Sequence, residues 1–258
     1  MGSALVDSHC HLDAPEFAGD RDEVIARAQA VGVGQQVIPA INAAGWPALK
    51  DLCDSNRGLF PAYGLHPMFL RDHQPQHLIA LGDWLQRERP VAVGECGLDY
   101  FVGDLDQGQQ NLYFGGQLAL AREFELPLIL HARRAVDAVI AAIKRVGALR
   151  GVVHSFSGSP EQARQLWNLG FLLGIGGPVT YERAHRLRGL VAEMPLEFLL
   201  LETDSPDQPD AQHRGQRNEP ARLSVVCETV ATLRGMDAGQ VAAATSENAR
   251  RLFRLPAP

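Results

Sequence analysis

Residues 91–100 read VAVGECGLDY, a short apolar run that turns polar at Glu95. The same change recurs in VDSHCHLD (6–13), LILHARR (128–134), VVHSFSG (152–158) and LLLETDSP (199–206). A short run rich in Val, Ile and Leu is typical of a strand buried in a parallel sheet. Histidine and carboxylate side chains follow these runs one after another, which favours a metal site over scattered surface charge.

Apolar runs of this kind alternate with amphipathic stretches along the whole chain. The expected strands are 4–7, 36–39, 59–64, 91–94, 128–130, 151–153, 171–174 and 198–201. Helical patterns cover 21–31, 75–88, 107–125, 135–146, 160–169 and 181–193, and 237–252 reads as closing helices. Eight strand–helix units predict an α/β fold, a (β/α)₈ TIM barrel, with its active site at the carboxyl ends of the strands.

Two details of the helical stretches carry separate expectations. Gly115 and Gly116 fall inside the stretch 107–125, although each glycine weakens a helix by roughly 1 kcal/mol relative to alanine. The pattern alone does not explain them. Ser246 or Asn248 is expected to cap a closing helix.

Length and composition limit the class of protein. With 258 residues and 46% hydrophobic composition the chain can bury a substantial core, and we expect a single domain over 1–258. The net charge of −6 gives no global attraction for nucleic acid, so such binding would depend on local arginines and bound metal. The start of the chain leaves no room for a signal peptide, and no apolar run spans a membrane. Four cysteines without CxxC spacing argue against a disulfide framework. We expect a cytoplasmic protein. We also expect a monomer without an obligate protein partner.

The candidate metal ligands share a position at the carboxyl end of an expected strand. They are His9, His11, Glu95, His131, His154 and Asp204. His9 and His11 are two apart on a strand, so both side chains project to one face and can hold one ion, while Cys10 points away. A pair of satisfied polar histidines explains that motif equally well in isolation. The four further ligands favour a binuclear site for two divalent ions, with zinc, manganese and magnesium all open as the metal.

A bridging anion is needed between two such ions. Some barrel hydrolases use a carbamylated lysine at a strand end, but the chain contains only Lys50 and Lys144, and both fall in expected helices. Glu95 is the natural bridge, because a carboxylate has two oxygens.

Several blocks in this order carry a resemblance that covers nearly the whole chain. They are DSHCHLD, GLHP, GECGLDY, the stretch from QLALA to LILHARRA, VVHSFSG, GIGGPVTY and LLETDSP. The sequence resembles the TatD-type metal-dependent hydrolases, a deoxyribonuclease family within the amidohydrolase superfamily. The segment ETDSPDQPDAQHRGQRNEP looks closest to a bacterial branch of uncharacterised hydrolases. The resemblance implies that His9, His11, Glu95 and Asp204 hold one ion, and that Glu95, His131 and His154 hold the second.

Residues next to these ligands are candidates for substrate contacts. They are His66, Arg133, Ser155 and Asn218. His66 can donate a hydrogen bond to a phosphate or leaving group, or it is an ordinary turn histidine. Arg133 can reach an anionic substrate, whereas Arg134 reads as a solvated charge at a helix start.

Other residues near the expected ligands have both a functional and a purely structural interpretation. Asp99 orients a ligand or caps a turn, and Cys96 reads as a small buried residue. Phe156 stacks a base or plugs a loop. The polar loop 213–219 gates substrate or is simply solvated.

The leading hypothesis for function is metal-dependent hydrolysis of DNA phosphodiester bonds. In this mechanism a metal-activated water attacks, Asp204 takes its proton, and the ions stabilise charge on the phosphate. DNA as substrate follows from the resemblance, whereas the ligands imply only hydrolysis. The alternative is hydrolysis of a small amide, ester or lactone, or of an aminoacyl ester on RNA, at the same binuclear site. A third reading, a metal-binding scaffold without turnover, fits six intact ligands poorly.

Overall fold

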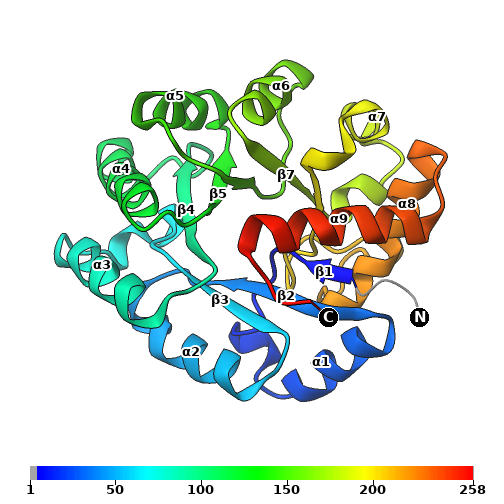
Figure 1. Cartoon of the computed structure of the whole chain (residues 1–258), viewed down its shortest axis with the longest axis horizontal. Helices are drawn as coiled ribbons and strands as arrows, with labels where there is room; N and C mark the ends of the chain where they lie inside the picture. The colour runs from blue at the N-terminus through cyan, green and yellow to red at the C-terminus, as the bar shows by residue number, and fades with distance from the viewer. Residues whose placement is uncertain (1–4, 258) are drawn as a thin grey trace. The chain divides into compact units, whose positions relative to one another are not determined.

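A computed structural model describes residues 5–257, and within them eight parallel strands form one sheet in sequence order with helices between them (Figure 1). The predicted (β/α)₈ fold is confirmed. The strands are β1 (Leu5–Asp7), β2 (Val33–Pro39), β3 (Leu59–Tyr63), β4 (Ala92–Asp99), β5 (Leu128–Arg133), β6 (Gly151–Val153), β7 (Phe171–Ile175) and β8 (Leu199–Leu201). The α-helices are α1 (Arg21–Ala30), α2 (Trp46–Ser55), α3 (Gln76–Glu88), α4 (Gln107–Glu123), α5 (Val136–Val146), α6 (Pro160–Asn168), α7 (His185–Glu193), α8 (Leu223–Arg234) and α9 (Ala238–Phe253). Among the described residues, no helix combines the length and apolar character needed to cross a bilayer.

Internal packing divides the chain into two compact units, which we describe separately. The first unit comprises the described residues within 1–38, 56–59 and 173–258, and the second comprises 39–55 and 60–172. β2, β3 and β7 each contribute residues to both. The single domain expected over 1–258 stays a prediction. Of the expected first strand, residue 4 lies outside the described residues.

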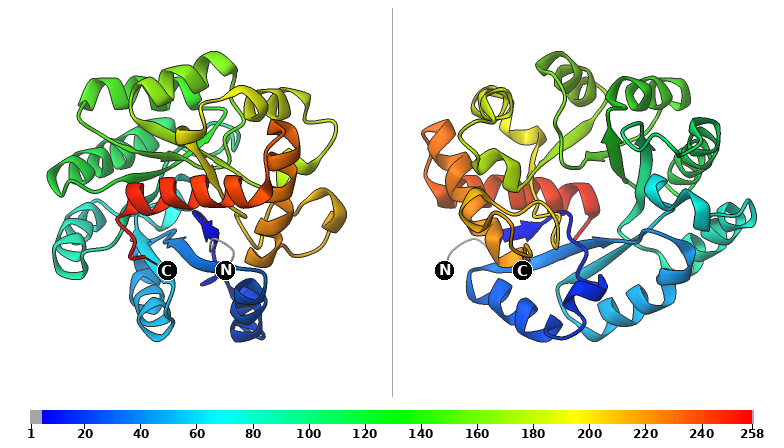
Figure 2. Two further views of the ribbon diagram at one scale, coloured as in Figure 1. Left: turned by 45° about the vertical axis from the view of Figure 1, so that its right-hand side comes forward. Right: turned by 180° about the vertical axis from the view of Figure 1, so that it is seen from behind.

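In the first unit, α9 packs on β1 and β8 (Figure 2). The Ser246 hydroxyl accepts a hydrogen bond from the backbone N–H of Val6 at 3.2 Å. The side-chain amide of Asn248 donates to two carbonyls at and just before the start of β8, at 3.0 and 2.8 Å. The expectation that Ser246 or Asn248 caps a helix is therefore wrong, because both lie inside α9 and satisfy the main chain of the strands. Asp237 caps α9 instead.

In the second unit, α4 holds the ends of two strands through buried glutamines. Gln117 accepts from the backbone N–H of Leu65 at 2.7 Å and donates to its carbonyl at 3.1 Å. Gln110 does the same for Asp99, at 2.8 and 2.9 Å. The two glutamines are seven residues apart and so lie on one face of the helix. They fix the backbone beside His66 and at the end of β4.

β4 and β5 run further than the apolar patterns indicate. β4 continues to Asp99 and β5 to Arg133, so Glu95 and His131 lie within strands and not after them. The two strands pack tightly at Gly97, where an added Cβ would lie 2.0 Å from the carbonyl oxygen of His131. A side chain at Gly97 would therefore push His131 out of place.

The two unexplained glycines in α4 have different surroundings. A Cβ at Gly116 would lie 2.8 Å from the nearest methyl carbon of Leu78 on α3, whereas a Cβ at Gly115 would meet nothing within 4 Å. Gly116 thus permits the close packing of α4 on α3, and Gly115 has no such role.

This difference predicts opposite effects of one substitution at adjacent positions. Gly115→Ala should stabilise the protein by up to about 1 kcal/mol, because alanine is the better helix former and meets open space. Gly116→Ala should gain less or destabilise by about 1 kcal/mol, because Leu78 must move. Urea unfolding of both variants measures the difference. Equal stabilisation by the two changes would show that Leu78 imposes no constraint.

Candidate metal centre

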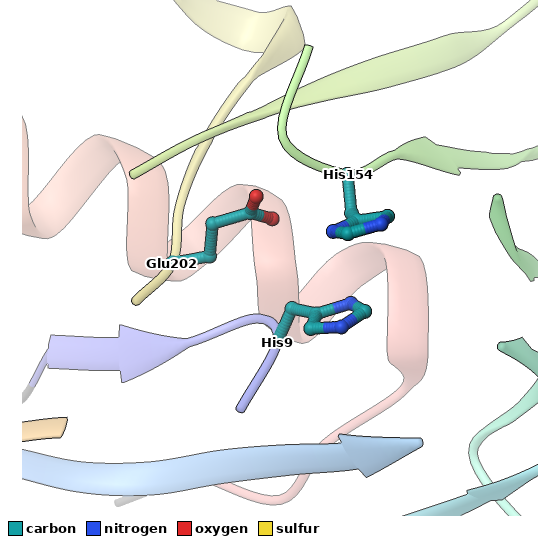
Figure 3. Close-up of side chains that lie close together, drawn as sticks. All are labelled: His9, His154 and Glu202. Carbon is teal, nitrogen blue, oxygen red and sulfur yellow. The ribbon is translucent and has the colours of Figure 1, made fainter. Parts of the chain in front are cut away.

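The first unit gathers His9, His11 and Asp204 into one cluster. The Nε2 atoms of His9 and His11 lie 3.1 Å apart, and the nearer carboxylate oxygen of Asp204 lies 3.4 Å from the first and 3.8 Å from the second. Two donors that bind one ion at about 2.1 Å each lie roughly 3 Å apart. The spacing of these three donors therefore fits a metal ion. Figure 3 shows His9 following β1, together with His154 after β6 and Glu202 after β8.

Asp7 ties the segment that carries His9 to the segment that carries Asp204. Its carboxylate accepts from the backbone N–H groups of His9 and Thr203, at 3.2 and 3.0 Å, and from the Thr203 hydroxyl at 2.6 Å. Burial raises the pKa of Asp7 to about 7, although these hydrogen bonds oppose the rise. The backbone N–H of Asp204 also donates to the carbonyl of His9 at 2.9 Å. Sequence reasoning assigned no role to Asp7, since its partner Thr203 is distant in the chain.

Glu202 is a second residue that sequence reasoning missed. Its side chain is completely buried, and one of its carboxylate oxygens lies within 4.8 Å of a ring nitrogen of His9. Space for the carboxylate comes from Gly174 on β7, where a Cβ would lie 2.0 Å from Glu202 Oε2. Its place two residues before Asp204, at the end of an apolar run, was the available signal.

The second unit gathers three histidines around Glu95. Glu95 Oε1 lies 2.8 Å from His66 Nε2, 3.1 Å from His131 Nδ1 and 2.8 Å from His154 Nε2. The carboxylate is only 1% exposed. A buried carboxylate is costly unless opposite charge or hydrogen bonds compensate it. This donor set of two or three nitrogens and a carboxylate suits a divalent transition ion.

Hydrogen bonds on the far side of the rings assign their protons. His131 Nε2 lies 2.8 Å from an oxygen of Asp99, so this nitrogen donates and Nδ1 keeps the lone pair that a metal needs. His66 Nδ1 accepts from the backbone N–H of Met68 at 3.1 Å, so the proton of neutral His66 is on Nε2. His131 is therefore set up as a ligand and His66 as a hydrogen-bond donor toward Glu95.

Asp99 serves both roles that the sequence left open. One oxygen accepts from His131, and the other accepts from the backbone N–H groups of Phe101 and Val102 at 2.9 and 3.1 Å. Burial opposes ionisation of Asp99, but these hydrogen bonds outweigh it and lower its pKa. Burial likewise opposes protonation of His131, yet the neighbouring carboxylates of Asp99 and Glu95 raise its pKa.

The remaining candidates differ in how far they are available to a substrate. Arg133 is exposed at the end of β5, and Ser155 is half-buried with a φ of 45°. Asn218 is 2% exposed, and its amide donates to the carbonyls of Thr203 and Asp207 at 2.9 and 2.8 Å. Its predicted substrate contact gains no support from this arrangement, which holds the loop after β8 in place.

Three neighbours follow the blander reading. Cys96 is completely buried, and burial raises the pKa of its thiol, so it is a poor nucleophile. Phe156 is 2% exposed and fills the interior. Arg217 lies in the loop 213–219, for which the sequence left both a substrate gate and a solvated segment open, and it forms a two-pronged ion pair with Asp20 at 2.7 and 2.6 Å.

The role of Asp99 can be tested by replacing it with asparagine. In Asp99→Asn the side-chain NH₂ competes for the position facing His131 Nε2, which favours the wrong tautomer and removes the lone pair on Nδ1. Affinity for the ion held by His131 should fall about 10- to 100-fold, as measured by competition with a chromophoric chelator. Asp106→Asn is the matched control, because Asp106 only caps α4 and asparagine caps as well. Equal affinities in both variants would remove Asp99 from the metal centre.

Comparison of the sequence with known proteins identifies the family of this chain. The sequence model described as TatD related DNase matches residues 6–254. The chain is 40% identical, over 98% of both sequences, to a protein of Escherichia coli K12 named as the uncharacterized metal-dependent hydrolase YjjV. It is 36% identical to a protein of Erwinia tasmaniensis named as the 3′-5′ ssDNA/RNA exonuclease TatD, over 97% of this chain and 100% of that protein.

A solved structure extends the likeness to three dimensions. The crystal structure of the Escherichia coli TatD homologue YjjV superposes with a TM-score of 0.95 and 39% identity, covering 99% of this chain and 100% of that one. Sequence and fold agree along nearly the whole length. The chain belongs to the family of TatD-related DNases and is a metal-dependent hydrolase.

Proposed function

We propose that this hydrolase cleaves phosphodiester bonds of DNA with two divalent ions. The observation that carries the proposal is the Glu95 carboxylate surrounded by imidazoles, with the outer nitrogen of His131 held by Asp99 at 2.8 Å. That arrangement supports a metal ligand set in the second unit, and the cluster of His9, His11 and Asp204 supports another in the first. The name of the Erwinia relative supports nucleic acid as the substrate class.

The proposal assigns one ion to His9, His11 and Asp204 and the other to His131 and His154, with Glu95 contributing a carboxylate oxygen to both. Zinc or manganese suits the imidazole nitrogens, and magnesium is the further candidate. The whole chain would act as one catalytic domain. We propose that it works as a cytoplasmic monomer.

Bound divalent ions acidify water and neutralise charge that develops on a phosphate. Asp204 is the proposed base, because its carboxylate is half-buried beside the two histidines and is oriented by a hydrogen bond from Gln208. His66 is the proposed donor to the phosphate or the leaving oxygen, through the Nε2 proton that otherwise faces Glu95. Arg133 and Ser155 are proposed substrate contacts, and Asn218 is retained as a residue that holds the loop after β8.

The second candidate is hydrolysis of a small amide, ester or lactone, or of an aminoacyl ester on RNA. The net charge of −6 favours it, since a polyanion is repelled by an acidic protein. A panel of end-labelled single- and double-stranded DNA beside small amides and esters, with product identification, decides between the two. Turnover of DNA should fall steeply as salt rises, whereas turnover of a small neutral substrate should not.

Asp204→Asn tests the proposed base. The variant keeps the shape and one oxygen but loses the negative charge, so the single-turnover rate at saturating metal should drop by roughly 10² or more. Circular dichroism should show an unchanged fold. Asp207→Asn, the same change three residues away on the exposed surface, is the control and should leave the rate unaltered. A near-parental rate in Asp204→Asn would refute the assignment of the base.

Glu95→Gln tests the shared carboxylate. Loss of its charge should reduce metal content and abolish most turnover, because the buried imidazoles around it lose their counter-charge. Cys96→Ala, at the adjacent buried position, should keep both metal content and turnover within about twofold, since it removes only a small side chain. Elemental analysis and initial rates give the comparison. A fully loaded and fully active Glu95→Gln protein would contradict the binuclear proposal.

A further inference from the structure

An exposed aromatic side chain lies next to the metal centre of the second unit and carries two arginines. Phe101, in the loop after β4, is 46% exposed. The guanidinium carbons of Arg133 and Arg134 lie 3.8 and 4.6 Å from the centre of its ring. Guanidinium groups at this distance from an aromatic ring are held by cation–π attraction. We call these three residues the arginine clamp.

The arginines of the clamp have no acidic partner among the described residues, unlike several other exposed arginines of this acidic chain. Arg71 pairs with Asp104, Arg164 with Glu161, and Arg87, although it also stacks on a ring, pairs with Glu88. A ring fixes the position of a guanidinium without neutralising it. The clamp therefore presents two positive charges whose hydrogen-bonding groups are available to an anion.

The clamp is joined to the metal ligand His131 by short connections. Asp99 accepts from the backbone N–H of Phe101 with one oxygen and from His131 with the other. The backbone N–H of Tyr100 donates to the carbonyl of Arg133 at 2.9 Å. The loop that carries the ring and the strand that carries the arginines are thus fixed to each other and to the ligand.

We infer that the arginine clamp is a subsite for a backbone phosphate of the nucleic acid other than the one that is cleaved, with Phe101 as the residue that positions both guanidiniums. This inference rests on the proposed function. Arginine binds phosphate through two parallel N–H groups, and holding it on a ring reduces the conformational entropy lost on binding. The subsite also gives an acidic protein the local positive charge that a polyanion requires.

Binding can be measured apart from cleavage with metal-loaded protein and a fluorescent single-stranded DNA that has phosphorothioate linkages, which keep the charge and resist hydrolysis. Arg133→Ala and Arg134→Ala should each weaken binding roughly tenfold. In the double variant the slope of log affinity against log salt should fall by about 0.7 for each phosphate that the protein no longer neutralises. Metal content should stay unchanged.

Two further comparisons isolate the clamp. Arg87→Ala removes another guanidinium stacked on a ring, at 4.3 Å from Trp84, and should leave binding within about twofold of the parent. Phe101→Leu should weaken binding several-fold in the parent but have no effect once both arginines are alanine. Phe101→Tyr, which keeps an aromatic ring, should bind DNA as the parent does. An abasic strand of equal length should bind the parent about as well as DNA does.

Each result decides one point. Losses in the Arg133 and Arg134 variants no larger than in Arg87→Ala overturn the clamp. An abasic strand that binds far more weakly than DNA, with the difference lost in Phe101→Leu, assigns the ring to a stacked base and overturns the phosphate. If the clamp variants bind as expected but the parent hydrolyses an ester and no phosphodiester, the proposed function fails and the subsite stands.

Discussion

Burial of the Glu95 carboxylate is the constraint on which the metal centre of the second unit depends. A carboxylate that is 1% exposed is stable only if its surroundings compensate its charge. The Nε2 proton of His66 compensates part of this charge directly, and a metal ion held by His131 and His154 would compensate the rest, so each ring must present the correct nitrogen. Asp99 determines that nitrogen for His131, and the backbone at Met68 determines it for His66. The protonation states of His66 and His131 thus depend on the backbone at Met68 and on Asp99, whose own backbone is held by Gln110 of α4.

Much of this could be predicted from sequence because both signals are local. Strand ends show as changes from apolar to polar residues, and ligand types are recognisable at those changes, so the fold and the candidate ligands emerged together. The extent of β4 and β5 did not, since their backbone pairing shifts register between Val93 and Cys96 and then continues to Asp99 and Arg133, whatever the polarity of the side chains. The glycine at position 97 allows that pairing, and its meaning depends on a strand more than thirty residues away.

Contacts between residues distant in the chain could not be predicted, for the same reason. Asn218 reads as a polar loop residue, yet its amide is consumed by backbone carbonyls near β8. Ser246 and Asn248 read as caps because polar residues usually end helices, but they face the main chain of the sheet. Arg134 reads as a solvated charge, whereas its position over Phe101 depends on a loop from the preceding strand–helix unit. No window of sequence contains both members of these pairs.

The side-chain amides of Gln110 and Gln117 in α4 make the hydrogen bonds that a neighbouring strand would otherwise make. Each offers one acceptor and one donor to a single residue, as the next strand of a sheet would, at Leu65 and Asp99 where regular pairing ends. The backbone just after β3 and at the end of β4 is thereby held in place by α4. Insertions or substitutions in residues 103–106, beyond the backbone N–H groups of Phe101 and Val102 that hold Asp99, can then alter what the enzyme recognises without loosening the ligands behind it. The loops that follow the strands can therefore change to admit new substrates while the metal ligands keep their positions.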